Sequence, residues 1–210
     1  MSFKVKYKKR IIMKQLIFIT GFILIWFMGQ TQNNGTFKDE RDGQTYNWVK
    51  IGSQIWMAEN LNYEAEQDCW VYEDSSRYAK IYGRLYDWEK ASEVCPDGWH
   101  LPTNREWEKL EKSLSTNLGS KLAGASPLWK SGSLTKNSAI GTSGFSALPA
   151  GHRYMGIFQD LGEKTSFWSS TELGVAHAVA RKLNYDYIGI RRIGGFKEYG
   201  MSVRCIKNKH

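Results

Sequence analysis

The 210-residue sequence has few of the residues that build metal and redox centres. It contains three cysteines and four histidines, and it has no C-x-x-C motif. The missing motif argues against a zinc knuckle or a thioredoxin-type site. His100, His152 and His177 lie on three separate segments without a short-spaced pair, so they do not predict a metal centre. We therefore expect no cofactor and no metal.

The sequence also lacks a strongly basic body, although its formal net charge is +8. Six of the 29 Lys and Arg residues lie in residues 1–30, and none of the 21 Asp and Glu residues does. The rest of the chain is therefore close to a charge of +2. This balance gives no indication of nucleic acid or an anionic membrane as a partner.

The apolar run at residues 16–28, LIFITGFILIWFM, is too short to cross a membrane comfortably. Its length of roughly 20 Å as a helix falls short of a hydrocarbon core of about 30 Å. A basic stretch precedes it and polar residues follow, which is the order of a secretory signal peptide. We predict a signal peptide at residues 1–30, with Met13 as an alternative start, and a linker at residues 31–41. The chain is then extracytoplasmic (periplasm, cell surface or secreted), and an uncleaved membrane anchor is the alternative.

Residues 42–207 are predicted to form one α+β domain. Two β-prone runs, 45–51 and 54–58, are separated by Gly52-Ser53, which indicates a hairpin. Helical spacing predicts a first helix over residues 82–94. Thr103 and Glu106 form a capping box that opens a second helix, and residues 119–147 are predicted to be loop. Four short strands are expected after that, at 166–171, 176–185, 187–193 and 200–206. A hairpin, then helices, then strands is the order of an α+β fold.

Six segments of the chain resemble one known family in their order and residues. They are DGQTYNWVKIGSQIWMAENLNY (42–63), YGRLYDW (82–88), CPDGWHLPTNREW (95–107), GFSALPAGHR (144–153), WSSTE (168–172) and YGMSVRC (199–205). Together they resemble the Fibrobacter succinogenes major paralogous domain family. The resemblance implies a C-type-lectin-like fold, with two helices packed on a twisted antiparallel sheet and long loops. Relatives occur on bacterial surfaces, and in some of them the C-terminal strands and loops bind the ligand.

The resemblance also bears on the three cysteines. It implies a disulfide between Cys95 and Cys205, and two buried free thiols are the alternative. Relatives often carry another cysteine where this sequence has Ala79 or its neighbours. Cys69 is therefore expected to be a buried thiol, an exposed thiol, or the link in a thiol-linked dimer.

Two chemistries of related proteins are disfavoured here. Sugar-binding C-type lectins hold calcium with Glu-Pro-Asn or Gln-Pro-Asp and a following Trp-Asn-Asp, and neither motif is present. Glu59, Asn60 and Glu172 remain candidates for a structural ion. Formylglycine-generating relatives use paired cysteines with copper, and no such pair lies near the end of this chain. We expect His100, close to Glu106, to make local hydrogen bonds rather than to act in catalysis.

The aromatic residues include candidates for the core and candidates for the surface. Tryptophans within the shared motifs are expected in the core, whereas Trp70 and Trp129 are expected to be exposed. Residues 181–199 are rich in Tyr and Arg, the residue types that dominate binding hot spots. Arg181, Tyr185 and Lys197 match family positions. The preferred ligand-binding candidates depart from the small polar residues usual there; they are Tyr187, Ile190, Arg191, Arg192 and Phe196.

These observations favour an exported, non-catalytic binding or adhesion module. Its partner would be a glycan or a cell-surface protein, recognised through the C-terminal strands and loops. One alternative is a structural envelope protein that has no small ligand of its own. Residues 181–199 would then form ordinary strands. A second alternative is a divergent enzyme related to the formylglycine-generating proteins.

Overall fold

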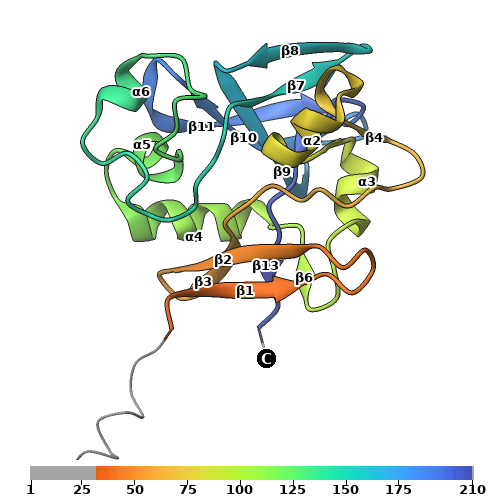
Figure 1. The fold of residues 1–210 in the computed structure, drawn as a ribbon, viewed down its shortest axis with the longest axis horizontal. Coiled ribbons are helices and arrows are strands. Elements are labelled where there is room, and N and C mark those ends of the chain that lie inside the picture. The colour runs from red at the N-terminus through yellow and green to blue at the C-terminus, as the bar shows by residue number, and fades with distance from the viewer. Residues whose placement is uncertain (1–31, 210) are drawn as a thin grey trace, which may run out of the picture. The chain divides into compact units, whose positions relative to one another are not determined.

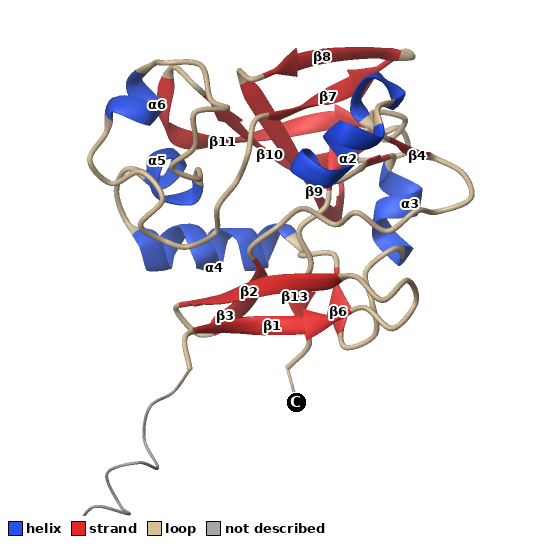
Figure 2. Cartoon of the chain, viewed as in Figure 1, coloured by secondary structure: helices blue, strands red, loops and turns tan. Residues whose placement is uncertain are grey.

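The structure of the protein, a computed structural model, describes residues 32–209 (Figure 1). The signal peptide predicted at residues 1–30 lies outside these residues. Within them, no helix has the length and apolar character needed to cross a membrane. The body that begins at Asn34 is a mixed α+β structure with two sheets and short helices (Figure 2).

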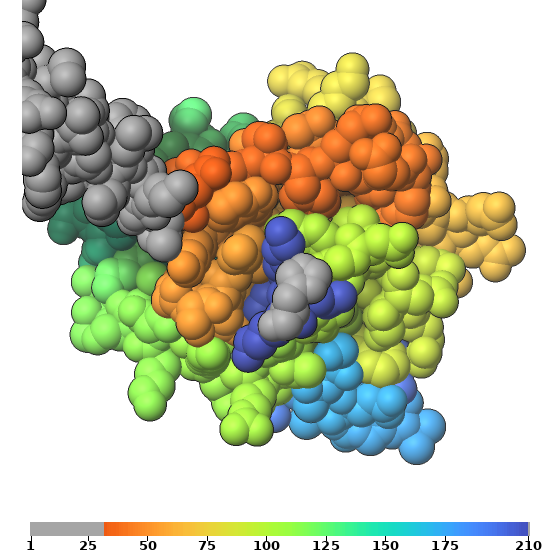
Figure 3. Space-filling view, turned by 90° about the horizontal axis from the view of Figure 1, so that it is seen from below, coloured from red at the N-terminus to blue at the C-terminus, as the bar shows by residue number. Residues whose placement is uncertain are grey.

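The first sheet has five strands in the order β1-β2-β3-β13-β6. Their bounds are β1 Asn34–Lys38, β2 Thr45–Ile51, β3 Gln54–Met57, β6 Trp99–His100 and β13 Ile206–Lys207. The predicted hairpin is confirmed as β2 and β3, which pair with Val49 opposite Trp56. Ile206 also pairs with Trp56, so the end of the chain returns to the first hairpin. Figure 3 shows the last residues, in dark blue, beside the orange strands.

The linker predicted at residues 31–41 is wrong for residues 34–38, which form strand β1 at the edge of this sheet. The segment is polar, but Phe37 gives it an apolar anchor. The Phe37 ring stacks on Trp99 and Tyr46, with centroid separations of 4.3 and 5.5 Å. Pairing with β2 and this aromatic contact together order a segment whose composition is typical of a linker.

The second sheet has eight strands, with a main order of β11-β10-β9-β12-β5-β4 and with β7 and β8 beside β9. Their bounds are β4 Cys69–Trp70, β5 Leu85–Tyr86, β7 Ala150–Tyr154, β8 Ile157–Leu161, β9 Lys164–Glu172, β10 His177–Asn184, β11 Tyr187–Phe196 and β12 Met201–Ser202. The strands predicted between residues 166 and 193 are confirmed as β9, β10 and β11. The hairpin of β7 and β8 was not predicted. It turns at Met155 and Gly156, both with positive φ, as tight hairpin turns require.

The second predicted helix is confirmed, and the first is corrected. Helix α4 (Asn104–Leu114) begins at Thr103, and both hydrogen bonds of the capping box are present. The first helix was expected over 82–94, but Gly83 has positive φ and residues 85–86 form β5. Helix α3 (Trp88–Glu93) therefore starts later, where the Asp87 side chain accepts the Lys90 N–H. The other helical segments are η1 Tyr72–Asp74, α2 Ser76–Tyr82, α5 Leu118–Leu122 and α6 Ser133–Lys136. Helix α6 falls within the predicted loop, and α5 overlaps its start.

Helix α4 lies between the two sheets, and the core forms around it (Figure 1). Trp107 of α4 packs with Trp56, Phe145 and Phe167. A second cluster lies around α3 and includes Trp88, Trp168 and Met201. The expectation that Trp129 is exposed is wrong: it is buried, and its indole N–H donates to the Ala147 carbonyl at 3.1 Å. Trp70 is half-buried, with the Arg153 guanidinium 4.3 Å from its ring centroid.

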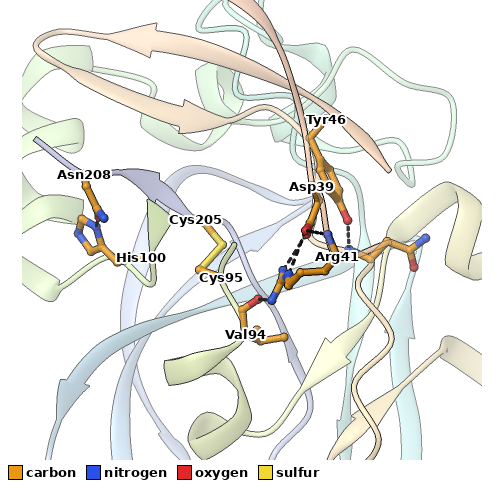
Figure 4. Close-up of a disulfide and its surroundings, with 9 residues drawn as sticks. Asp39, Arg41, Tyr46, Val94, Cys95, His100, Cys205 and Asn208 are labelled. Carbon is orange, nitrogen blue, oxygen red and sulfur yellow. Dashed lines mark hydrogen bonds and ion pairs between the residues drawn. A yellow bond between two sulfur atoms is a disulfide. The ribbon is translucent and has the colours of Figure 1, made fainter. Parts of the chain in front are cut away.

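The predicted disulfide is present between Cys95 and Cys205 (Figure 4). It joins the end of α3 to the buried C-terminal segment, across 110 residues of sequence. Beside it, Arg41 binds the buried Asp39 carboxylate at 2.7 Å and donates to the Val94 carbonyl at 3.0 Å. Among residues 32–209, Cys69 is the free cysteine; it is half-buried, and burial raises the pKa of its thiol.

Candidate functional site

The two C-terminal strands present different residues on the two faces of the sheet. Strands β10 and β11 pair with Arg181 opposite Arg192 and Lys182 opposite Arg191, so each pair shares a face. On one face, Arg181 binds Glu111 of α4 and Arg192 donates to Asn104 Oδ1 at 3.1 Å. That face is therefore tied to α4. The other face carries Lys182 and Arg191 and is free of that helix.

A cluster of charges lies on this free face. It consists of Lys164, Lys182, Arg191 and Asp160, which we call the cationic cluster. Asp160 accepts a hydrogen bond from Lys164 at 2.8 Å and lies 3.4 Å from His152 Nδ1. The cluster thus has three cations and one carboxylate, and it carries an excess of positive charge.

The pKa shifts show how this excess acts on its members. Burial lowers the pKa of Lys182, as do the nearby charges of Lys164 and Arg191, and Asp160 only partly offsets them. Burial also lowers the pKa of His152. The charges of Lys182 and Lys164 add to this effect, and Asp160 partly offsets it. Partly buried groups with shifted pKa values are typical of ligand-binding and functional sites. An anionic group bound here would compensate the charge.

Aromatic rings gather at the other end of the β10–β11 pair from the cationic cluster. Four of them form what we call the aromatic row: His177, Phe196, Tyr199 and Tyr154. Successive ring centroids are 4.1, 5.5 and 4.5 Å apart. His152 lies between the two groups, 6.4 Å from the Tyr199 ring and beside Asp160. Beside the row, a hollow of about 160 Å³ is lined by Tyr154, Met155, Phe196, Glu198 and Tyr199.

The structure separates the five residues predicted to bind ligand. Tyr187 and Arg191 lie on the free face, where the guanidinium is 4.9 Å from the ring centroid. Phe196 belongs to the aromatic row and is 41% exposed. Ile190 packs against the core cluster around α4, and Arg192 binds Asn104. We therefore leave these last two out of the site.

Sequence reasoning missed the part of the site that the β7–β8 hairpin contributes. That part is His152, Tyr154 and Asp160. The Met155-Gly156 pair between two β-prone runs was the signal that could have found the hairpin. Lys164 and Lys182 were also missed, because only the register of β9 and β10 places them beside Arg191.

His100 makes local hydrogen bonds, as the sequence indicated. Its Nδ1 lies 2.6 Å from Asn208 Oδ1 (Figure 4). Its Nε2 lies 3.1 Å from the Glu106 carboxylate. Glu106 also accepts the Thr103 N–H at 2.9 Å. Burial alone would raise the pKa of Glu106, but the bonds from Thr103 and His100 outweigh it and lower the pKa. The Glu106 carboxylate is thus engaged at the start of α4.

The three residues suggested for a structural ion have separate partners. Glu59 accepts two hydrogen bonds from Asn47, whereas Glu172 lies 3.2 Å from Lys197. Asn60 bonds to the Tyr82 carbonyl and to Arg204. Across residues 32–209, no group of three or more His, Cys, Asp or Glu side chains is arranged to hold a metal ion.

Comparisons with known proteins give one positive finding. A search of curated proteins and a search of solved structures each found no match. The model of the family described as Fibrobacter succinogenes major domain matches residues 49–207, about three quarters of the chain. The match spans β3 to β13 and includes the disulfide and the candidate site. The chain therefore belongs to the Fibrobacter succinogenes major domain family.

Proposed function

We propose that this protein is an exported, non-catalytic binding module that recognises an acidic glycan. The observation that carries the proposal is that His152 links the aromatic row to the cationic cluster: its ring lies 6.4 Å from the Tyr199 ring and its Nδ1 lies 3.4 Å from Asp160. Aromatic rings stack on the apolar faces of sugar rings and bury area with little loss of side-chain freedom. Cationic side chains supply charge-assisted hydrogen bonds to carboxylate or sulfate groups.

The arrangement of the chain supports a C-type-lectin-like architecture for this module. Strand β13, at the end of the chain, pairs with β3 near its start, and a helix packs between the sheets. The disulfide joins Cys95 to the last segment, as the family resemblance implies. A disulfide is also typical of proteins that fold outside the cytoplasm, which supports export.

The rigidity of the face supports recognition of an extended ligand. Strands β9, β10 and β11 are paired along most of their length, and their opposite face is fixed to α4. The Tyr187 ring lies over Gly189, where an added Cβ would come within 2.8 Å of the ring. The ring and the neighbouring guanidinium are thus held in place before binding, which reduces the entropy cost of association.

Adjacent arginines provide a matched test of the proposal. Arg191→Ala removes a cation from the proposed face, whereas Arg192→Ala removes one from the face tied to α4. We expect Arg191→Ala and Phe196→Ala each to weaken binding of an oligouronate about tenfold, roughly 1.4 kcal/mol. Arg192→Ala should bind like the unaltered protein. Isothermal titration with the oligouronate and with its neutral, carboxyl-reduced counterpart measures these affinities.

The same titration can also refute the proposal. Equal affinity of the Arg191→Ala and Arg192→Ala variants would remove the site assignment. Equal affinity for the charged and the neutral oligosaccharide would remove the role of the cationic cluster. Binding to the oligouronate should also weaken as the salt concentration rises, because exposed charges are screened.

A further inference from the structure

The hollow of about 160 Å³ beside the aromatic row has a charge pattern of its own. It lies where the β7–β8 hairpin meets the loop after β11, and three rings of the row line it together with Met155 and Glu198. All five side chains are accessible to a ligand: Met155 is 77% exposed, Phe196 is 41% exposed, Glu198 is exposed, and the two tyrosines are half-buried. Sites for drug-sized ligands measure about 300–1,000 Å³, so this smaller hollow suits one compact head group.

The three rings do not form a flat platform. The Tyr199 ring lies between the other two, with centroid separations of 5.5 Å to Phe196 and 4.5 Å to Tyr154. Its plane is inclined by 42° to that of Phe196 and by 56° to that of Tyr154. Because the planes are tilted and all three rings line one hollow, a compact group seated there contacts several rings at once.

The hollow is electronegative. The faces of aromatic rings carry partial negative charge, and the Glu198 carboxylate adds a full charge to the lining. Among residues 32–209, no Lys, Arg or His nitrogen lies within 4.0 Å of that carboxylate. Burial raises the pKa of the Tyr199 hydroxyl, and Tyr154 and the nearby charge of Glu198 raise it further. The hollow therefore favours a cation.

The cations nearest to the hollow in sequence are engaged elsewhere. Lys197 lies 3.2 Å from the Glu172 carboxylate, and its ammonium group is 4.1 Å from the centroid of the Trp88 ring. Arg153 precedes Tyr154 on β7, so its side chain points to the opposite face of the strand. Its guanidinium lies 4.3 Å from the centroid of the Trp70 ring. Both cations thus leave the rings of the hollow to a ligand.

We propose that this hollow, the Glu198 hollow, binds a small quaternary ammonium compound of the choline type. The methyl groups of the ligand pack against the three rings and Met155, and its positive charge lies against the ring faces and near Glu198. A primary ammonium group is strongly hydrated and needs hydrogen-bond acceptors, which ring faces supply poorly. The proposal does not rest on the acidic glycan, because the cationic cluster lies at the other end of the β10–β11 pair.

Choline and its neutral carbon analogue, 3,3-dimethylbutanol, separate the effect of charge from that of shape. Isothermal titration is carried out on the full chain with each compound at matched ionic strength. We expect choline to bind with a Kd of about 1 mM and the neutral analogue to bind at least about tenfold more weakly. No heat from choline at about 10 mM would overturn the proposal, as would equal affinity for the two compounds.

Glu198→Gln removes the charge of the hollow and keeps the shape of the side chain. It should weaken choline about fivefold to tenfold and leave the affinity for 3,3-dimethylbutanol unchanged. Glu40→Gln is the matched control, because Glu40 is 80% exposed and lies outside the lining of the hollow. A Glu198→Gln variant that binds choline as the control does would overturn the proposal.

Phe196→Leu tests the ring face separately, because leucine keeps an apolar side chain but lacks the π electrons. It should weaken choline by a larger factor than it weakens 3,3-dimethylbutanol, and equal weakening of both would overturn the role of the ring. An unchanged urea midpoint shows that each variant is folded. Oligouronate binding by Glu198→Gln should be no weaker than that of the unaltered protein, so a failure of the choline proposal and a failure of the glycan proposal can be told apart.

Discussion

Removal of the Cys95–Cys205 disulfide should cost a large part of the stability of this fold. The bridge spans 110 residues, and the chain-entropy relation for a loop of that length gives about 5 kcal/mol at 25 °C. Domains of ordinary stability have only about 5–15 kcal/mol in total. Removal of the disulfide is therefore expected to take at least about a third of the free energy of unfolding.

Urea denaturation followed by tryptophan fluorescence measures the effect, since tryptophans lie in both core clusters. With a slope of about 2 kcal/mol per molar urea, the loss corresponds to a midpoint lower by roughly 2 to 3 M. The comparison uses the oxidised protein, the reduced protein and the Cys95→Ala/Cys205→Ala variant. Reduction is included because Cys205 is fully buried and its truncation also leaves a small cavity.

Cys69→Ser is the control and should leave the urea midpoint close to that of the unaltered protein. A midpoint shift under about 0.5 M on reduction would refute the loop-entropy reasoning.

Three further predictions concern charges and caps within the fold. Glu111→Gln leaves the buried Arg181 without its carboxylate and should cost about 3–5 kcal/mol in urea denaturation; a loss under about 1 kcal/mol would contradict the pairing. Thr103→Ala removes the α4 cap and should cost about 1 kcal/mol, whereas Thr103→Ser, the control, should keep most of it. Burial alone would raise the pKa of Asp39, but Arg41 lowers it, and the pKa of Glu106 is lowered as well. Because the unfolded chain then binds more protons near pH 3 to 4, stability should fall as the pH drops below about 4.5, and Asp39→Asn should flatten that fall; an unchanged slope would exclude Asp39 as its source.

Local signals in the sequence predicted the elements that depend on local chemistry. The turn at Gly52 and the alternating residues around it fixed the β2–β3 hairpin, and the capping box fixed the start of α4. The first helix was misplaced because its apolar spacing extends through a stretch where Gly83 has positive φ. Short segments such as α5 and α6 carry too few turns to show a period, so their sequence is indistinguishable from loop.

The candidate site depends on long-range pairing and was predicted only in part. Tyr187, Arg191 and Phe196 were proposed from residue type, and the structure shows where each lies. Residue type cannot separate Arg191 from Arg192, because adjacent strand residues point to opposite faces and only the packing of α4 shows which face is covered. The disulfide pairing came from the family resemblance, since three cysteines allow more than one pair.

The two faces of β11 give the strand two separate roles. One face is fixed by the bond from Arg192 to Asn104 and by the packing of Ile190 against the core around α4. Near the C-terminal end of β11, the backbone at Gly195 packs closely against the core. An added Cβ there would lie 2.6 Å from Met201 and 2.9 Å from Trp168, so a larger residue would not fit. Positions 187 and 191 carry no such constraint, since their side chains contact each other rather than the core. The strand can therefore exchange the residues at positions 187 and 191 at little cost in stability. This separation allows the binding preference of the free face to change while the fold is preserved.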